Sequence, residues 1–115
     1  MASKLQSYEP ITGGIMLRLT LMAQGPTEAV VAVDGWITGE EVGLLEREGE
    51  RWLQEVSHLV LDLNGVRFID QTGIELLKRW SAAEKLALHG GALFVQSLLQ
   101  AHGLTSAISS EAHDN

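Results

Sequence analysis

Four consecutive residues at the predicted start of a helix, Asp70, Gln71, Thr72 and Gly73, combine a carboxylate, an amide, a hydroxyl and a glycine. A carboxylate placed before a helix caps backbone N–H groups. The N-terminus of a helix also carries a partial positive charge, so a phosphate added there would not melt the helix. Thr72 has a hydroxyl that can accept a phosphate, whereas Gln71 has none. From the residues alone, the first interpretation of this turn is a structural N-cap, in which Gly73 allows close approach to a neighbouring strand, and a binding surface is the alternative.

Three carboxylates, Asp34, Asp62 and Asp70, lie near the ends of predicted strands. Carboxylates gathered at one sheet edge can bind a cation or transfer protons. The chain has no nucleophile elbow, phosphate loop or dinucleotide fingerprint. We therefore predict a protein that is not an enzyme and that has no metal site and no cofactor. Structural or solvent-facing roles are expected for the four histidines, which are His58, His89, His102 and His113.

The composition limits the classes of partner. The chain has 115 residues, no cysteine and a formal net charge of −7. Nucleic acids and anionic membrane surfaces attract clustered Lys and Arg, so an acidic chain is not expected to bind either, and a basic protein partner is favoured. No apolar run reaches the roughly 18 residues of a membrane span, and residues 1–10 lack the apolar core of a signal peptide. These features predict a cytoplasmic protein with no direct membrane insertion.

Alternating apolar and polar residues predict the elements before the motif. Residues 15–23 alternate with a period of two, and residues 29–33 form a short β-branched run. The short link between them, 24–27, predicts an antiparallel hairpin. Residues 34–39 are expected to be a loop, and an amphipathic helix is expected over about 40–56. Thr38 can cap this helix, and Glu41, three residues later, completes a capping box.

The second half of the chain repeats the strand–helix alternation. A buried strand is predicted at 58–63, a turn at Asn64–Gly65 and an apolar link at 66–69. A helix is expected from Asp70 to about Leu88, ended by His89 and two glycines. A strand at 92–96 and a short helix at 98–102, capped by Ser97, complete the pattern. The order β-β-α-β-α-β-α predicts one α/β domain with a mixed sheet covered by helices.

The organisation that follows is a flexible lead-in over 1–14, one domain over 15–104 and a polar tail over 105–115. Trp52 and Trp80 fall on apolar helical faces and are predicted to be buried. Trp36 is placed in the loop after the second strand. There it either folds over the core edge or anchors a partner, as exposed tryptophan often does.

Residues 60–77 read Val-Leu-Asp-Leu-Asn-Gly-Val-Arg-Phe-Ile-Asp-Gln-Thr-Gly-Ile-Glu-Leu-Leu. This stretch resembles the signature of the STAS family of anti-sigma-factor antagonists, in which a buried strand leads through Asp-x-x-Gly into an apolar helix. The downstream segments 90–96 and 98–104 are similar to the second half of the family, and residues 33–38 to its segment after the second strand. The resemblance covers roughly 15–104 and implies the fold already predicted.

The resemblance also implies a function. In the family, a serine directly after the motif aspartate is phosphorylated by the kinase domain of the anti-sigma factor, and phosphorylation blocks binding. Gln71 stands at that position here, so the usual switch is not expected, while Thr72 is the nearest hydroxyl. The resemblance thus implies a bacterial signalling module in transcription regulation that binds an anti-sigma factor or related kinase-like regulator. Asp70, Gln71, Thr72, Gly73 and Trp36 are its expected contact residues.

Two other functions remain open from the sequence. One is a STAS subunit of a lipid-transport or ABC-transporter-associated complex, in which the domain assembles other subunits. The other is a sensor of a small ligand or nucleotide. The sequence leaves the oligomeric state undetermined.

Overall fold

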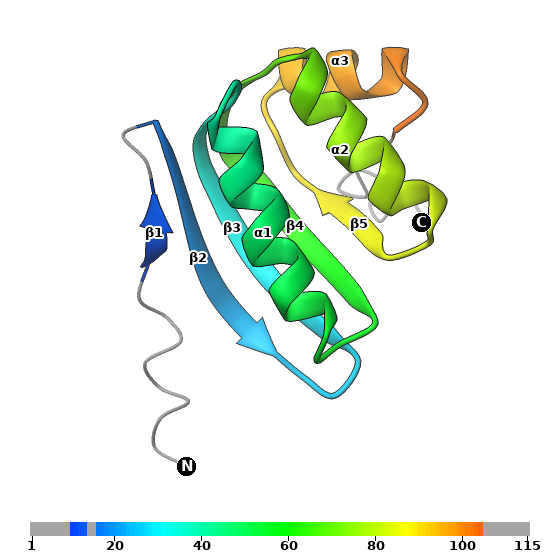
Figure 1. Cartoon of the computed structure of the whole chain (residues 1–115). Helices are drawn as coiled ribbons and strands as arrows, with labels where there is room; N and C mark the ends of the chain where they lie inside the picture. The colour runs from blue at the N-terminus through cyan, green and yellow to red at the C-terminus, as the bar shows by residue number, and fades with distance from the viewer. Residues whose placement is uncertain (1–9, 14–15, 105–115) are drawn as a thin grey trace.

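Two antiparallel and two parallel pairings build a five-stranded sheet in the computed structural model, which describes residues 10–13 and 16–104. Sheet order equals chain order, from β1 to β5. Helices α1 and α2 lie on one face of the sheet, and α3 lies at the end where α2 begins (Figure 1). The elements are β1 (Pro10–Gly13), β2 (Leu17–Gln24), β3 (Glu28–Ile37), α1 (Glu41–Leu53), β4 (His58–Ile69), α2 (Gln71–Ala82), β5 (Leu86–His89) and α3 (Leu93–Ala101).

The hairpin and the order of strands and helices are confirmed. β2 and β3 pair antiparallel from Leu17 opposite Gly35 to Gln24 opposite Ala29. From β2 onward the order is β-β-α-β-α-β-α, as predicted. Alternate residues of β2, beginning at Leu17, are buried, so only one face of the strand packs against the helices.

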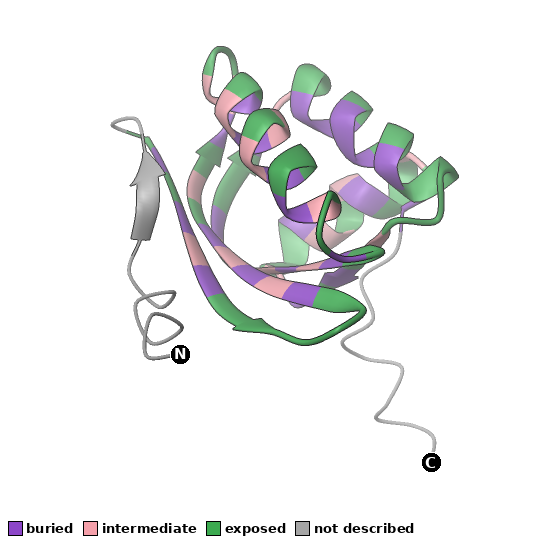
Figure 2. Cartoon of the chain, turned by 60° about the horizontal axis from the view of Figure 1, so that its bottom comes forward, coloured by how far each residue is buried: buried purple, intermediate pink, exposed green. Residues whose placement is uncertain are grey.

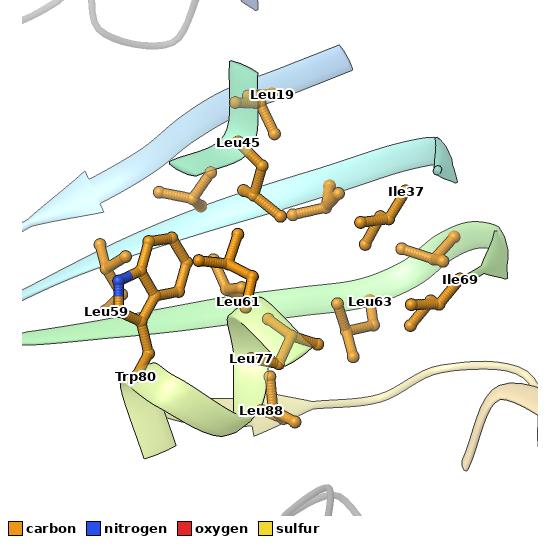
Figure 3. Packing of buried hydrophobic residues seen from close by; sticks show 14 of the residues in the cluster. Leu19, Ile37, Leu45, Leu59, Leu61, Leu63, Ile69, Leu77, Trp80 and Leu88 are labelled. Carbon is orange, nitrogen blue, oxygen red and sulfur yellow. The ribbon is translucent and has the colours of Figure 1, made fainter. Parts of the chain in front are cut away.

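The core lies between the sheet and the two covering helices. Leu59, Leu61 and Leu63 of β4 are fully buried and face Leu77 and Trp80 of α2 (Figure 3). The inner sides of α1 and α2 are buried and their outer sides exposed, as their amphipathic patterns require (Figure 2). The burial of both helical tryptophans, Trp52 and Trp80, is confirmed, with 6% and 3% of their surfaces exposed.

Helices α1 and α2 are joined by a close contact between Gly49 and Trp80. A Cβ atom on Gly49 would lie 2.3 Å from the indole atom Cη2 of Trp80, so only glycine fits there. The same indole donates its Nε1–H to Glu50 at 2.8 Å, which satisfies the polar edge of a buried ring. An exposed ion pair between Arg79 and Glu46, at 3.2 Å, also joins the two helices.

The predicted turn at Asn64–Gly65 is wrong, because β4 continues through it to Ile69. The strand is irregular there, because its pairing with β3 shifts register between Ala32 and Asp34 and between Gly35 and Trp36. A Cβ on Gly65 would lie 1.8 Å from the carboxylate oxygen Oδ1 of Asp34, so the missing side chain makes room for that carboxylate across the strands. The glycine serves a cross-strand contact and not a chain reversal.

The predicted boundaries after α2 are also wrong. The helix ends at Ala82, and Glu84 takes a left-handed conformation with a φ of 60°. The last strand is Leu86–His89, paired in parallel with Leu59–Asp62, and not residues 92–96. Residues 93–96 belong to α3 and Ala92 is its N-cap, so Ser97 lies inside the helix and is not its cap. Residues 82–88 have a helix-favouring composition, and pairing with β4 overrides that preference.

Three smaller expectations need correction. Trp36 belongs to β3 and not to a loop. Glu40 is the N-cap of α1 without a side-chain hydrogen bond, so Thr38 and Glu41 form no capping box, and Thr38 contributes only its backbone carbonyl. Residues 10–13 of the predicted flexible lead-in form β1 and pair with β2, while 1–9, 14 and the predicted tail 105–115 lie outside the described residues. Within the described part of the chain, no helix is both long enough and apolar enough to cross a bilayer.

The Gly49–Trp80 contact gives a stability prediction. Gly49→Ala should destabilise the fold, because overpacking a core costs about 1–3 kcal/mol. The matched control is Gly43→Ala in the same helix, where a Cβ meets nothing within 4 Å. That control should stabilise the protein by roughly 0.5–1 kcal/mol, the usual gain of alanine over glycine in a helix. Urea unfolding of both variants measures the difference, and equal free energies of unfolding would contradict the close contact.

Candidate functional site

The chain leaves β3 and β4 at the same end of the sheet, where α2 begins. The two strands are parallel, so their carboxyl ends lie at the same edge. The backbone N–H of Asp70 donates to the carbonyl of Ile37 at 3.1 Å, which joins the last residue of β3 to the residue before α2. The candidate turn therefore lies beside the loop that leads into α1.

Asp70 fixes this junction through both of its carboxylate oxygens. Oδ1 accepts the backbone N–H of Gly73 at 2.9 Å, which confirms the predicted N-cap. Oδ2 accepts the backbone N–H of Gly39, also at 2.9 Å, from the loop after β3. One side chain thus caps α2 and holds the neighbouring loop against it.

Gly73 is required for close packing at the first turn of α2. A Cβ there would lie 2.8 Å from Cγ2 of Ile37, 2.9 Å from the Ile37 carbonyl oxygen and 2.9 Å from Cγ2 of Ile69. Any larger side chain would push the start of α2 away from the ends of β3 and β4. The structural role foreseen for this glycine is confirmed.

Gln71 and Thr72 are both exposed at the first turn of α2. The Gln71 amide donates from Nε2 to Oε2 of Glu75, one turn along the helix, at 3.1 Å. The two side chains are therefore presented to solvent by a helix start that Asp70 holds in place. Their role as contact residues remains a prediction.

Trp36 lies at the same end of the sheet, on the face opposite the helices. It stands in register with Phe68, and residues opposite each other on neighbouring strands point to the same face. The two rings are 5.8 Å apart between centroids and tilted by 52°. About 40% of Trp36 and 41% of Phe68 is exposed, while the neighbouring Ile37 and Ile69 point into the core. Phe68 was not predicted as a site residue, because its pairing with Trp36 depends on the register shifts of β4.

The three carboxylates predicted near strand ends have separate structural contacts, and Asp34 and Asp62 lie inside β3 and β4 and not at their ends. Oδ1 of Asp62 accepts the backbone N–H of Asn64 at 2.9 Å and its side-chain amide at 2.8 Å. Asp34 lies over Gly65, and Asp70 caps α2. Within residues 10–13 and 16–104, no three His, Asp or Glu side chains are grouped to hold a metal ion.

The histidines in the described ranges lie at element boundaries. His58 begins β4 and His102 ends α3, as expected. His89 ends β5 and not a helix, which corrects its predicted place. His113 lies outside the described residues.

The double contact of Asp70 can be tested by amide hydrogen exchange. Asp70→Ala should lose both contacts, speed exchange at Gly39 and Gly73, and cost about 0.5–2 kcal/mol of stability, the usual value of an N-cap. Asp70→Ser retains a hydroxyl that can cap Gly73 in α2 but is too short to reach Gly39 in the loop after β3 as well. It should therefore speed exchange at Gly39 and leave Gly73 protected. Equal protection of Gly39 in all three proteins would show that the loop does not depend on this carboxylate.

Comparisons with known proteins bear on this geometry. The family model described as "Mlab, STAS domain" matches residues 21–109. Among solved structures, the anti-sigma factor antagonist SpoIIAA in its unphosphorylated form is similar, with a TM-score of 0.63. That match has 17% sequence identity and covers 84% of this chain and 93% of SpoIIAA, so it shows a shared fold. No curated protein sequence matches the chain. Because the family match spans most of its length, the chain belongs to the STAS domain family.

Proposed function

We propose that this chain is a cytoplasmic, non-enzymatic interaction module that binds an anti-sigma factor or related kinase-like regulator through the start of α2. The observation that carries the proposal is the presentation of Gln71 and Thr72, exposed on a helix start that the Asp70 carboxylate fixes to the neighbouring loop. A preorganised surface binds with less loss of conformational freedom. The fold shared with an anti-sigma factor antagonist supports the class of partner.

The proposal includes a surface that remains unphosphorylated at the usual position. Gln71 has no hydroxyl, and its amide is hydrogen-bonded to Glu75. A neutral side chain therefore occupies the place where the family's switch adds charge. The partner would be bound without release by a kinase, unless Thr72 accepts a phosphate instead.

A second candidate function is a permanent assembly subunit of a transporter-associated complex. Gln71 favours it, because an assembly subunit needs a constant surface and not a switched one. The identity of the protein that co-purifies with the tagged chain separates the two candidates: a sigma-factor regulator supports the first, and a transporter subunit supports the second.

A small-ligand sensor has less support. The described residues Glu75, Lys78 and Arg79 line an open hollow of about 200 Å³ on α2. Ligand sites usually occupy about 300–1,000 Å³ and are mostly apolar. The hollow is smaller than such sites, so it gives a ligand sensor no support of its own.

Intact mass spectrometry of the protein purified from its native cells tests the constant surface. We expect the unmodified mass in several growth conditions, because position 71 cannot accept a phosphate. Peptide mapping provides the control by covering Thr72 directly. A phosphate found on Thr72 would contradict the constant surface. It would indicate a phosphorylation switch one residue after the family's usual position.

A charge added to the start of α2 tests the binding site. Thr72→Arg should weaken binding of the co-purified partner about tenfold or more, equivalent to about 1.4 kcal/mol, because its bulk and positive charge would oppose a basic partner at this turn. Ser57→Arg is the matched control, because Ser57 is also exposed but precedes β4 at the opposite end of that strand. Binding of both variants is measured by titration calorimetry. Equal losses in the two variants, or no loss in either, would remove the start of α2 from the interface.

A further inference from the structure

Helix α3 differs from the other helices in its lack of charge. Residues 90–104, which include all of α3, contain no Asp, Glu, Lys or Arg, although these types make up 20% of the chain. Both α1 and α2 carry acidic and basic residues. Surfaces that become the centre of an interface are depleted of charge and enriched in aromatic side chains.

The first turn of α3 exposes two large apolar side chains. Leu93 is 80% exposed and Phe94 is 50% exposed, whereas Val95 and Leu99 of the same helix are fully buried. The helix therefore has an inner face packed on the core and a second apolar surface turned toward solvent. Ser97 and Ala101, at helical spacing from Phe94, continue this outer surface with small exposed residues that permit close approach.

Hydrogen bonds hold the start of α3 in place. Asn64 of β4 accepts the backbone N–H of Gly91 through Oδ1 at 3.1 Å. The Gln96 side chain donates to the carbonyl of Gly91 at 2.9 Å, and its backbone N–H donates to Ala92. Leu93 and Phe94 are thus carried by an ordered turn, which reduces the entropy lost when a partner binds.

The start of α3 lies at the same end of the molecule as the start of α2 (Figure 1). Both helices follow the carboxyl ends of the parallel neighbours β4 and β5. Glu40 and Glu41, before and at the start of α1, and Glu75, in α2, place three carboxylates at this end, where they outnumber the exposed Arg67 near the end of β4. Anionic lipid would be repelled by these carboxylates, whereas Lys and Arg of a protein partner would be attracted.

This inference rests on the proposed function, in which a partner binds at the start of α2. We propose that Leu93 and Phe94 are the hydrophobic anchor of that docking surface, and that its occupant is an apolar protein segment flanked by Lys or Arg. The anchor supplies contact area that the small polar side chains at the start of α2 do not provide. The carboxylates at the same end of the molecule select the charge of the partner and speed its approach.

Site-specific photocrosslinking in native cells tests the anchor. Benzoylphenylalanine replaces Phe94 in one full-length protein and Met22 in another, which is a matched position because it is a large apolar residue 45% exposed in β2, at a distance from this end. A third protein carries the same group in place of Gln71. We expect a strong protein adduct from position 94, mapped by mass spectrometry to an apolar segment with flanking Lys or Arg.

The outcomes separate the anchor from the wider function. Adducts at position 71 or 22 but not at 94 would keep a protein partner and overturn the anchor. An acidic segment or a lipid captured at 94 would overturn the stated chemistry of the occupant. No protein adduct at any of the three positions would overturn both the anchor and the interaction module.

Binding of the mapped partner then gives a quantitative check. Phe94→Ala should weaken binding at least tenfold, and Met22→Ala should leave it within twofold, because Met22 is 45% exposed in β2 at a distance from this end. Raising the salt concentration should weaken the wild-type complex several-fold, as attraction between opposite charges requires. A loss shared equally by both variants, or binding that does not depend on salt, would contradict the proposal.

Discussion

The burial of one face of β4 is the constraint on which the other elements depend. Its three leucines, Leu59, Leu61 and Leu63, are fully buried, and the strand pairs with both β3 and β5. A slip of one residue would turn all three leucines to the other face, so the register of the strand is strongly fixed. That register determines where β4 ends and hence where the chain turns into α2.

The candidate site follows from this ending. Asp70 occupies the residue after β4, and its carboxylate holds the loop after β3 and the first turn of α2 at equal distances. The same strand carries Asn64, which holds the start of α3. One strand therefore positions both the polar surface of Gln71 and Thr72 and the apolar surface of Leu93 and Phe94, although the two surfaces are far apart in the sequence.

Features encoded by neighbouring residues could be predicted, and features encoded by distant pairing could not. The Asp70 cap and the closeness of Gly73 depend on local chemistry that the motif displays. The strand at 86–89 has a helix-favouring composition, and only its pairing with β4 makes it extended. The side-chain direction of Trp36 depends on register shifts between β3 and β4. The exposed first turn of α3 could not be predicted, because its Leu-Phe-Val run is equally typical of a strand.

The consecutive order of the strands has a consequence for synthesis of the chain. Each strand pairs with the one made just before it, so the sheet can extend from its first hairpin with short loop closures as the chain leaves the ribosome. The end that presents Gln71, Thr72, Leu93 and Phe94 is completed only when α3 is added. A partner that binds this end would therefore distinguish a domain that includes α3 from one that lacks it.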